Sequence, residues 1–179
     1  MKDWGVALVY SASEGNLEEV KKLVESGVNV NSDNGQALIY ACFNGKLEVV
    51  KYLVAHDADI HAKNDEALIY ASIWGYLEIV KFLVEAGANI HARNDEAVIE
   101  ACNNDHLEVV KYLVDKGADI HTRSNEAVIG ACIDGYVSIV EYLVSQGVNI
   151  NTGIPLAIAK AKENIDMVRI LKEARTKEI

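Results

Sequence analysis

Apolar residues recur along this chain in columns that are thirty residues apart. A fixed period of this size predicts a solenoid, because one unit is too small to bury its own apolar face and must stack on the next. Three columns define the register: alanine at Ala7, Ala37, Ala67, Ala97 and Ala127; leucine or valine at Leu17, Leu47, Leu77, Leu107 and Val137; and glycine at Gly27, Gly87, Gly117 and Gly147, with Asp57 in the remaining unit.

The unit that ends at Gly87 shows which elements the pattern predicts. A first helix begins after an N-cap at Asn64 or Asp65 and ends at Gly75, which is suited to the left-handed conformation of a helix C-terminus. A second helix begins near Leu77, and its apolar positions recur at three- and four-residue intervals on one face. The predicted order is helix, glycine turn, helix, loop.

The two ends of the array differ from its middle. Charged residues replace apolar ones in the first and last units, and polar outer faces are typical of capping repeats. With a single proline, Pro155, and no flexible linker, the sequence marks no second domain. We predict one all-α domain, residues 1–179, with six helix–turn–helix units. They are an N-terminal cap at 1–34, inner repeats at 35–64, 65–94, 95–124 and 125–152, and a C-terminal cap at 153–179.

Composition narrows the classes of partner. The chain has 27 Asp and Glu against 17 Lys and Arg. Nucleic-acid binding needs a dense basic stripe to release counterions from phosphates, so nucleic acid is not an expected partner. No apolar run approaches the ~20 residues that cross a bilayer, and no signal peptide is apparent, so we expect no membrane partner.

The three cysteines, Cys42, Cys102 and Cys132, fall in one column. Units stacked ~8–10 Å apart hold them too far apart for a disulfide, which needs Cα atoms within ~7 Å. We therefore expect small buried thiols and a reducing compartment.

No motif predicts catalysis, a cofactor or a metal site. The sequence lacks a phosphate-binding glycine loop, a zinc-binding histidine motif and a nucleophile elbow, so we predict that the chain is not an enzyme. Histidines recur at His61, His91 and His121, but rings ~8–10 Å apart cannot share a zinc ion with bonds of ~2 Å. We expect their ring nitrogens to bond to backbone groups of neighbouring loops.

Two stretches carry a resemblance to a known family. Gly75–Ile90 resembles the second helix and hairpin start of the ankyrin repeat, and Ile154–Ala159 is similar to its Thr-Pro-Leu-His-x-Ala opening. The resemblance covers essentially the whole chain and implies a protein-binding scaffold. The period is shorter than the usual ~33 residues, so short loops or clipped β-hairpins are predicted between units. Shortened repeats of this kind also resemble those of giant DNA viruses of amoebae.

The strongest functional signal lies in the two positions before the mid-unit glycine, where the periodic rule lapses. In ankyrin-like geometry these positions lie on the concave rim, where the family contacts partners, and aromatic residues beside arginine are typical of hot spots. Alternatively Phe43 and Ile133 fold down onto neighbouring units; for Trp74 we favour exposure. Tyr40 and Tyr70 are interpreted as packing residues whose hydroxyl groups stay in contact with water. The candidate partner-binding residues are Phe43, Asn44, Ile73, Trp74, Asn103, Asn104, Ile133 and Asp134 at the helix ends, and Lys63, Arg93 and Arg123 along the loop edge.

The resemblance also implies a modification site. Asn31 and Asn151 occupy the hairpin position that an asparaginyl hydroxylase modifies in ankyrin repeats. The favoured alternative is an ordinary loop asparagine that bonds to its own backbone.

We therefore predict a monomeric, non-catalytic module that binds a protein through its concave rim and loop edge. We expect it in the cytoplasm, with the nucleus as a second compartment; a viral origin would make a host protein the partner and the host cytoplasm the location. The alternative is a structural protein that self-associates through the same apolar rim. A ubiquitin-ligase adaptor is disfavoured, since we expect no additional ligase-docking segment.

Overall fold

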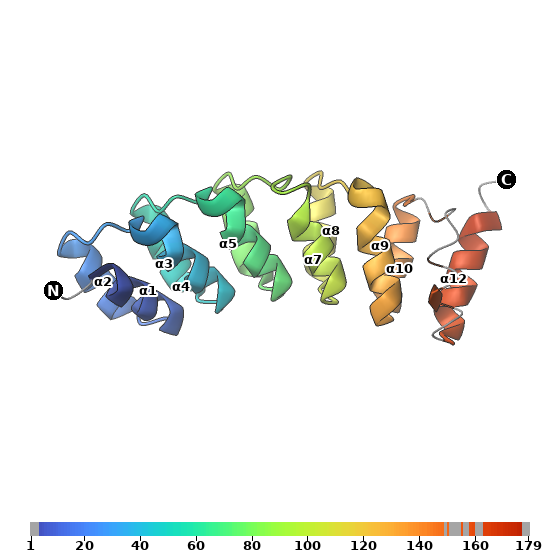
Figure 1. Cartoon of the computed structure of the whole chain (residues 1–179), viewed down its shortest axis with the longest axis horizontal. Helices are drawn as coiled ribbons and strands as arrows, with labels where there is room; N and C mark the ends of the chain where they lie inside the picture. The colour runs from blue at the N-terminus through green and yellow to red at the C-terminus, as the bar shows by residue number, and fades with distance from the viewer. Residues whose placement is uncertain (1–3, 149, 151–154, 156–157, 160–162, 177–179) are drawn as a thin grey trace.

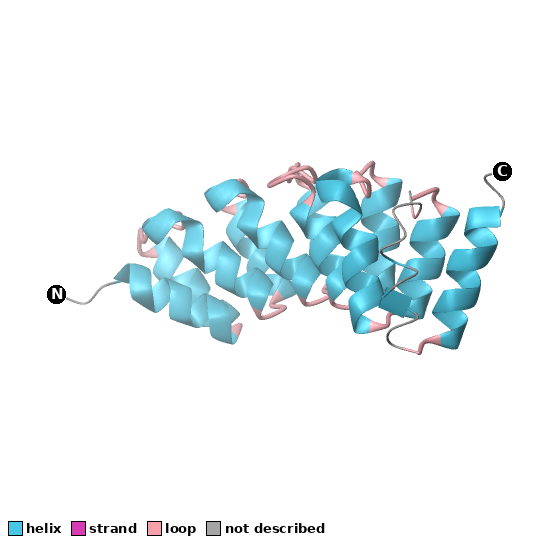
Figure 2. Cartoon of the chain, turned by 45° about the vertical axis from the view of Figure 1, so that its right-hand side comes forward, coloured by secondary structure: helices cyan, strands magenta, loops and turns pink. Residues whose placement is uncertain are grey.

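The computed structural model describes residues 4–148, 150, 155, 158–159 and 163–176. Within them the chain forms helices and loops and no strand (Figure 2). Pairs of helices stand side by side in chain order, with the loops between pairs along one edge (Figure 1). This confirms the predicted all-α solenoid. The helices are α1 (Trp4–Glu14), α2 (Leu17–Glu25), α3 (Ser32–Phe43), α4 (Leu47–Ala55), α5 (Ala62–Ile73), α6 (Leu77–Glu85), α7 (Glu96–Asn103), α8 (Leu107–Asp115), α9 (Thr122–Asp134), α10 (Val137–Ser145) and α12 (Ile165–Thr176).

Small side chains let the first helices of successive units pack closely. Ala67 and Ala97 are 1% and 2% exposed, and Ala71 and Ala101 are fully buried. As a result, α3, α5, α7 and α9 contact one another much more extensively than the second helices α4, α6, α8 and α10 do. Closer spacing on one side curves the stack, so the face formed by the first helices, here called the first-helix face, lies on its inner side.

The turn within each unit follows the predicted glycine. In the third unit α5 ends at Ile73 and Gly75 adopts a φ of 69°. The imidazole of His106, from the next unit, lies directly over Gly75 and its Nε2 donates a hydrogen bond to the carbonyl of Ile73 at 2.9 Å. A β-carbon at Gly75 would overlap with that ring. Gly75 therefore serves both the backbone turn and the stacking of units.

Short left-handed turns lie within the first residues of α3 and α5 and just before α7. Lys63, Asn64 and Asp65 have φ values of 53°, 58° and 58°, and residues 33–35 and 93–95 share this conformation. L-residues adopt it at a cost of roughly 1–2 kcal/mol each, less for Asn and Asp, whose short side chains tolerate it. These turns are the short loops that the reduced period predicts, and no clipped hairpin is found in the part of the chain that is described.

The prediction that Asn64 or Asp65 caps its own helix is wrong, because no side chain there caps α5. The carboxylate of Asp65, 4% exposed, instead accepts a hydrogen bond from the backbone N–H of Asn89 in the next loop at 2.8 Å. It also bonds to Nδ1 of His61 at 3.0 Å. The carboxylate therefore ties consecutive loops together.

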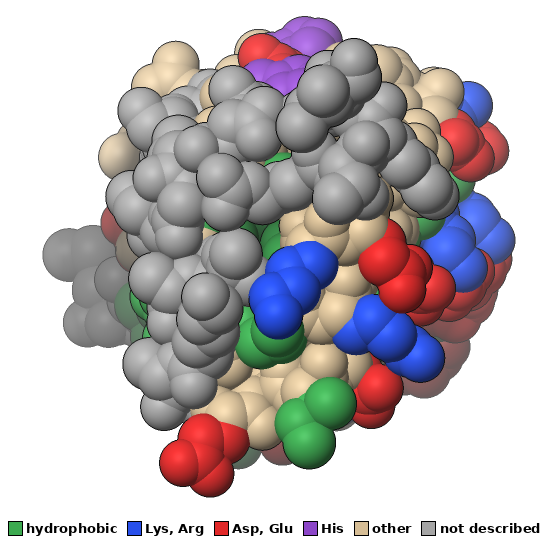
Figure 3. Space-filling model, turned by 90° about the vertical axis from the view of Figure 1, so that its right-hand side faces the viewer, with side chains coloured by type: hydrophobic (Ala, Val, Ile, Leu, Met, Phe, Trp, Pro, Cys, Tyr) green, Lys and Arg blue, Asp and Glu red, His purple; other side chains and the backbone are tan. Residues whose placement is uncertain are grey.

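The next unit repeats this arrangement. Asp95 accepts from the backbone N–H of Asp119 at 2.9 Å and pairs with Nδ1 of His91 at 2.8 Å. The expectation that the loop histidines bond to backbone groups of neighbouring loops is therefore wrong for His61 and His91, whose Nδ1 atoms face the carboxylate four residues later in the same loop. Viewed from the C-terminal end, histidine side chains lie at the edge of the molecule that carries the loops (Figure 3).

The second helices carry ion pairs on their solvent side. Red acidic and blue basic side chains lie close to one another on the right-hand side of Figure 3. Pairs three residues apart stabilise an exposed helix by only ~0.2–0.5 kcal/mol each, so they mark a solvated face. The Nζ–Oε1 distances are 2.9 Å for Lys51 and Glu48, 2.8 Å for Lys81 and Glu78, and 2.8 Å for Lys111 and Glu108.

We expect the Tyr112→Phe variant to keep or gain stability, by up to ~1 kcal/mol. The Tyr112 hydroxyl is buried and has no hydrogen-bond partner among the described residues, and the preceding unit carries Phe82 at the same position. Burial also raises the pKa of this phenol. Urea denaturation measures the difference in the free energy of unfolding. The converse variant, Phe82→Tyr, should lose stability; a loss of more than ~1 kcal/mol in Tyr112→Phe would mean that its hydroxyl is satisfied in solution.

Candidate functional site

Aromatic side chains of α3 and α5 meet on the first-helix face. The centroid of the Phe43 ring lies 5.3 Å from that of Tyr70 and 5.3 Å from that of Trp74, and the interplanar angles are 87° and 78°. The centroid of the Tyr40 ring lies 6.4 Å away. Such edge-to-face pairs add ~0.5–1.5 kcal/mol beyond the burial of area, so they hold the rings in place. Trp74 and Tyr40 are nevertheless 48% and 43% exposed. The cluster therefore presents ordered aromatic surface to solvent.

This surface continues onto α1. Val6 and Tyr10 are 62% and 66% exposed, and Tyr10 lies one period before Tyr40. We call the whole set the aromatic strip. It consists of Val6, Tyr10, Tyr40, Phe43, Tyr70 and Trp74.

The structure distinguishes among the apolar residues of the predicted rim. Phe43 is half-buried among aromatic rings, while Ile73 packs against the core. Trp74 is exposed, as the sequence predicted, and Ile133 on α9 is 45% exposed. Trp74 therefore offers the largest accessible side chain at these positions.

The polar residues of the predicted rim are partly engaged in the helix ends. The amides of Asn44 and Asn104 donate to the carbonyls of Tyr40 and Glu100, at 2.9 and 2.8 Å, and so satisfy the last turns of α3 and α7. Asp134 is exposed at the end of α9, and Asn103 is half-buried beside Gly130. The predicted rim residues beyond α5 are therefore polar, apart from Ile133.

The two cations of the loop edge that the structure describes are held by neighbouring units. Arg93 donates from Nη2 to the carbonyl of Lys63 at 2.7 Å, and its guanidinium lies 3.5 Å from Glu66 and 3.7 Å from Glu96. Lys63 lies 3.8 Å from Glu66. The side chain of Arg123 lies outside the described part of the chain. The loop edge is therefore a connected, partly exposed ionic network.

Asn31 bonds to the loop of the next unit. Its Nδ2 donates to the carbonyl of Asp57 at 2.9 Å, and its Oδ1 accepts from the backbone N–H of Asp59 at 2.7 Å. The alternative in which it bonds to its own backbone is therefore wrong. Hydroxylation of Asn31 stays a prediction, and Asn151 lies outside the described residues.

Sequence reasoning missed part of the aromatic strip. Tyr70 packs against the core as expected, whereas Tyr40, which was also expected to pack, is 43% exposed; the rings of both flank Phe43. The available signal was their spacing, since Tyr40 and Phe43 are three apart and residues three apart share a helix face. Tyr10 extends that column to α1 and carries the same signal.

The three cysteine thiols are buried and stay protonated. Cys42, Cys102 and Cys132 are buried and free. Desolvation raises the pKa of Cys102 and Cys132 to about 12, and it raises that of Cys42 as well, so the protonated form prevails at neutral pH. These thiols pack the core rather than act as nucleophiles.

Among the described residues, no group of His, Cys, Asp and Glu is placed to hold a metal ion, and no helix is long and apolar enough to span a membrane.

Stacked helix pairs with an ordered aromatic surface on their inner face define a helical repeat scaffold. The family model for ankyrin repeats (three copies) matches residues 8–94, 61–124 and 98–178. The chain therefore belongs to the ankyrin repeat family. Domains of this family generally mediate protein–protein interaction, and no catalytic family is indicated.

A solved structure agrees with this assignment at the level of fold. The human ASB11 ankyrin repeat domain superposes with a TM-score of 0.82 at 24% sequence identity, over 93% of this chain and 82% of that one. Among curated proteins, none matches the sequence significantly.

Proposed function

We propose that this chain is a non-catalytic module that binds a partner protein through the aromatic strip and the adjoining loop edge. The observation that carries the proposal is the exposure of Trp74, 48%, while its ring packs edge-to-face on Phe43. Trp and Tyr dominate binding hot spots because they bury a large area with little loss of conformational freedom. A partner that covers Trp74 gains this area without having to order it.

The loop edge supplies a polar rim to the same surface. Arg93 bridges Glu66 and Glu96, so its guanidinium is already oriented when a partner arrives. Rim charges of this kind act mainly on association rate and specificity, whereas buried aromatic anchors supply affinity. The aromatic strip is therefore the place to test first.

We expect Trp74→Ala to weaken partner binding by about 30-fold, since removal of a hot-spot aromatic costs ~2 kcal/mol or more. The partner would be captured from cell lysate with the full chain and its affinity for the purified variant measured by calorimetry. Ile165→Ala is the matched control, because Ile165 is an exposed apolar residue, 84% exposed, on the distant helix α12. Circular dichroism verifies that both variants keep their helicity. A partner held equally by the chain and Trp74→Ala would refute the proposed surface.

Self-association through the aromatic strip is the second candidate. It is favoured by Val6 and Tyr10, which expose apolar surface at the N-terminal end of the stack. Light scattering separates the candidates: the module is expected to have the mass of one chain, 19.6 kDa, whereas a larger mass that falls on Tyr10→Ser substitution would support self-association.

The proposal extends to the compartment in which the module works and to the origin of its partner. Three buried, protonated thiols suit a reducing compartment, so we place the module in the cytoplasm, with the nucleus as the second choice. If the resemblance to repeats of giant DNA viruses reflects the origin of the chain, the partner is a host protein in the host cytoplasm. In this proposal the binding surface extends over several of the units defined by the thirty-residue period.

A further inference from the structure

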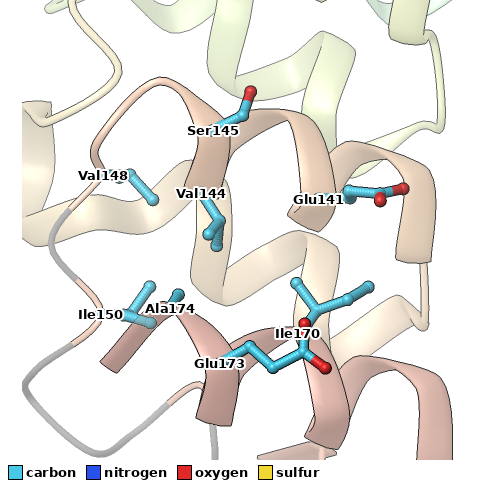
Figure 4. Close-up of a pocket in the computed structure, with 8 residues that line it drawn as sticks. All are labelled: Glu141, Val144, Ser145, Val148, Ile150, Ile170, Glu173 and Ala174. Carbon is cyan, nitrogen blue, oxygen red and sulfur yellow. The ribbon is translucent and has the colours of Figure 1, made fainter. Parts of the chain in front are cut away.

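A hollow of about 410 Å³ lies between α10 and α12, the second helices of the last two units. Its apolar lining comes from both sides, with Val144, Val148 and Ile150 in or just after α10 and Ile170 and Ala174 on α12 (Figure 4). Val148 and Ile150 are buried, and the other three are half-buried. The volume is within the range of ligand-binding pockets, ~300–1,000 Å³.

The hollow lies where the stack lacks an aromatic side chain. The sixth residue of each second helix from α4 to α10 is aromatic, whereas the sixth residue of α12 is Ile170. The rings of this column pack against the core, and burial together with the Asp115 carboxylate of α8 raises the pKa of the Tyr142 phenol on α10. Isoleucine is smaller than these rings, so part of the space that a ring takes up in the inner units stays open. The aromatic residues of the column are Tyr52, Phe82, Tyr112 and Tyr142.

The edge of the hollow lacks the positive charge that the same position carries in earlier units. The fifth residue of α4, α6 and α8 is a lysine, which pairs with a glutamate three residues before it. The fifth residue of α10 is Glu141, and Ser138 stands where that glutamate would be, so α10 cannot form this ion pair. Glu141 is exposed and lines the hollow. An apolar hollow with a carboxylate at its edge suits a ligand that is apolar at one end and cationic at the other.

We propose that this hollow receives an aromatic side chain of a partner protein, from a segment in which Lys or Arg is the next residue. The ring would take the position that the aromatic column leaves open between α10 and α12, and the cation would lie against the carboxylate of Glu141. The ring supplies buried area, while the opposite charges select the neighbouring residue. This site lies on the second helices, apart from the aromatic strip, and so goes beyond the proposed function.

A second copy of this chain is a poorer occupant of the hollow. The exposed aromatic residues among the described part of the chain are Trp4, Tyr10, Tyr40 and Trp74, and none has Lys or Arg next to it in sequence. Each copy also carries a net charge of −10, so two copies would bring like charges together. A basic, aromatic segment of another protein has neither disadvantage.

The test titrates a capped tetrapeptide, Gly-Phe-Lys-Gly, into the full ¹⁵N-labelled chain and follows the backbone amides by NMR. We expect saturable shifts at Val144, Ser145, Ile170 and Ala174, with a Kd of ~10 mM or tighter, which the burial of one aromatic ring supports. The capped peptide Gly-Ala-Lys-Gly, which lacks the ring, should bind at least tenfold more weakly.

Two variants restore the residue types of the earlier units. Ile170→Tyr fills the hollow with a ring of the chain itself and should weaken binding of Gly-Phe-Lys-Gly at least tenfold. Glu141→Lys should weaken the same peptide about fivefold and strengthen the charge-reversed peptide Gly-Phe-Glu-Gly. A loss of fold would not produce that reversal, and circular dichroism checks both variants for helicity.

Trp74→Ala is the control, and it should leave the affinity for Gly-Phe-Lys-Gly unchanged because Trp74 lies on the first-helix face. An absence of saturable shifts at the hollow, or binding that Ile170→Tyr does not weaken, would overturn the site. Equal preference for the two charged peptides before and after Glu141→Lys would overturn the assignment of the cation. A mass above that of one chain in light scattering, abolished by Ile170→Tyr, would show that a second copy fills the hollow and would overturn the assignment of a separate partner. Each of these contrary results leaves the function proposed for the aromatic strip standing.

Discussion

Replacing Gly75 by alanine is expected to lower the free energy of unfolding by about 3 kcal/mol, one of the two largest effects we predict. Two costs combine. Gly75 has a φ of 69°, which an alanine adopts only with strain of roughly 1–2 kcal/mol. The new β-carbon would also overlap with the His106 ring, which must leave and give up its hydrogen bond to the carbonyl of Ile73.

Two further variants separate these costs in urea denaturation. Gly147→Ala carries a similar backbone penalty, since φ is 80°, but nothing lies within 4 Å of its β-carbon, so we expect a loss of only ~1–2 kcal/mol. In a His106→Ala background, Gly75→Ala should cost no more than Gly147→Ala. Equal losses for the two glycine variants in the parent chain would show that His106 moves away at no cost.

Asp65→Ala is expected to lower the free energy of unfolding by about 2–3 kcal/mol. The substitution removes a buried, charge-assisted acceptor and leaves the backbone N–H of Asn89 without the partner it has at 2.8 Å. It also frees His61 Nδ1. Hydrogen exchange should show the largest increase in the Asn89 amide and its loop, because that amide loses its protection directly.

The control for Asp65→Ala is Asp33→Ala in an earlier loop. Asp33 is also left-handed, with a φ of 54°, but it is exposed, and the loop that follows it is tied by Asn31 instead. Both variants therefore place alanine in the same backbone region, and only one removes a bond between loops. A loss for Asp65→Ala no greater than that for Asp33→Ala would mean that the carboxylate contributes nothing beyond its backbone preference.

Local patterns in the sequence were sufficient for the helices. The alternation of apolar and polar positions located α5 and α6, and the mid-unit glycine marked the turn at Gly75, because these features depend on residues within one or two helical turns. The ion pair of Glu78 with Lys81, at 2.8 Å, depends on the same local geometry, because the two residues are three apart on one helix.

Contacts between units could not be predicted in the same way. The carboxylate of Asp65 accepts a hydrogen bond from Asn89, 24 residues away. Patterns within one or two helical turns cannot reveal such a partner, and they indicated only that Asp65 caps its own helix. Arg93 seemed available to a partner, yet it bonds to the carbonyl of Lys63, 30 residues earlier. The exposure of Tyr40 was underestimated for a related reason, since it depends on which side of the helix the next unit covers.

The columns that build the core and the column that begins with Tyr10 occupy different positions of the same helices. Ala67 and Ala71 are buried between first helices, whereas Tyr70, which lies between them in sequence, belongs to the aromatic strip and contacts Phe43. Mutation in the column that begins with Tyr10 can therefore alter recognition while the buried residues that stack the units stay the same. Duplication of one unit would lengthen the recognition surface by one first helix. New specificities can therefore evolve when the exposed residues of one unit are substituted and those of the other units stay unchanged.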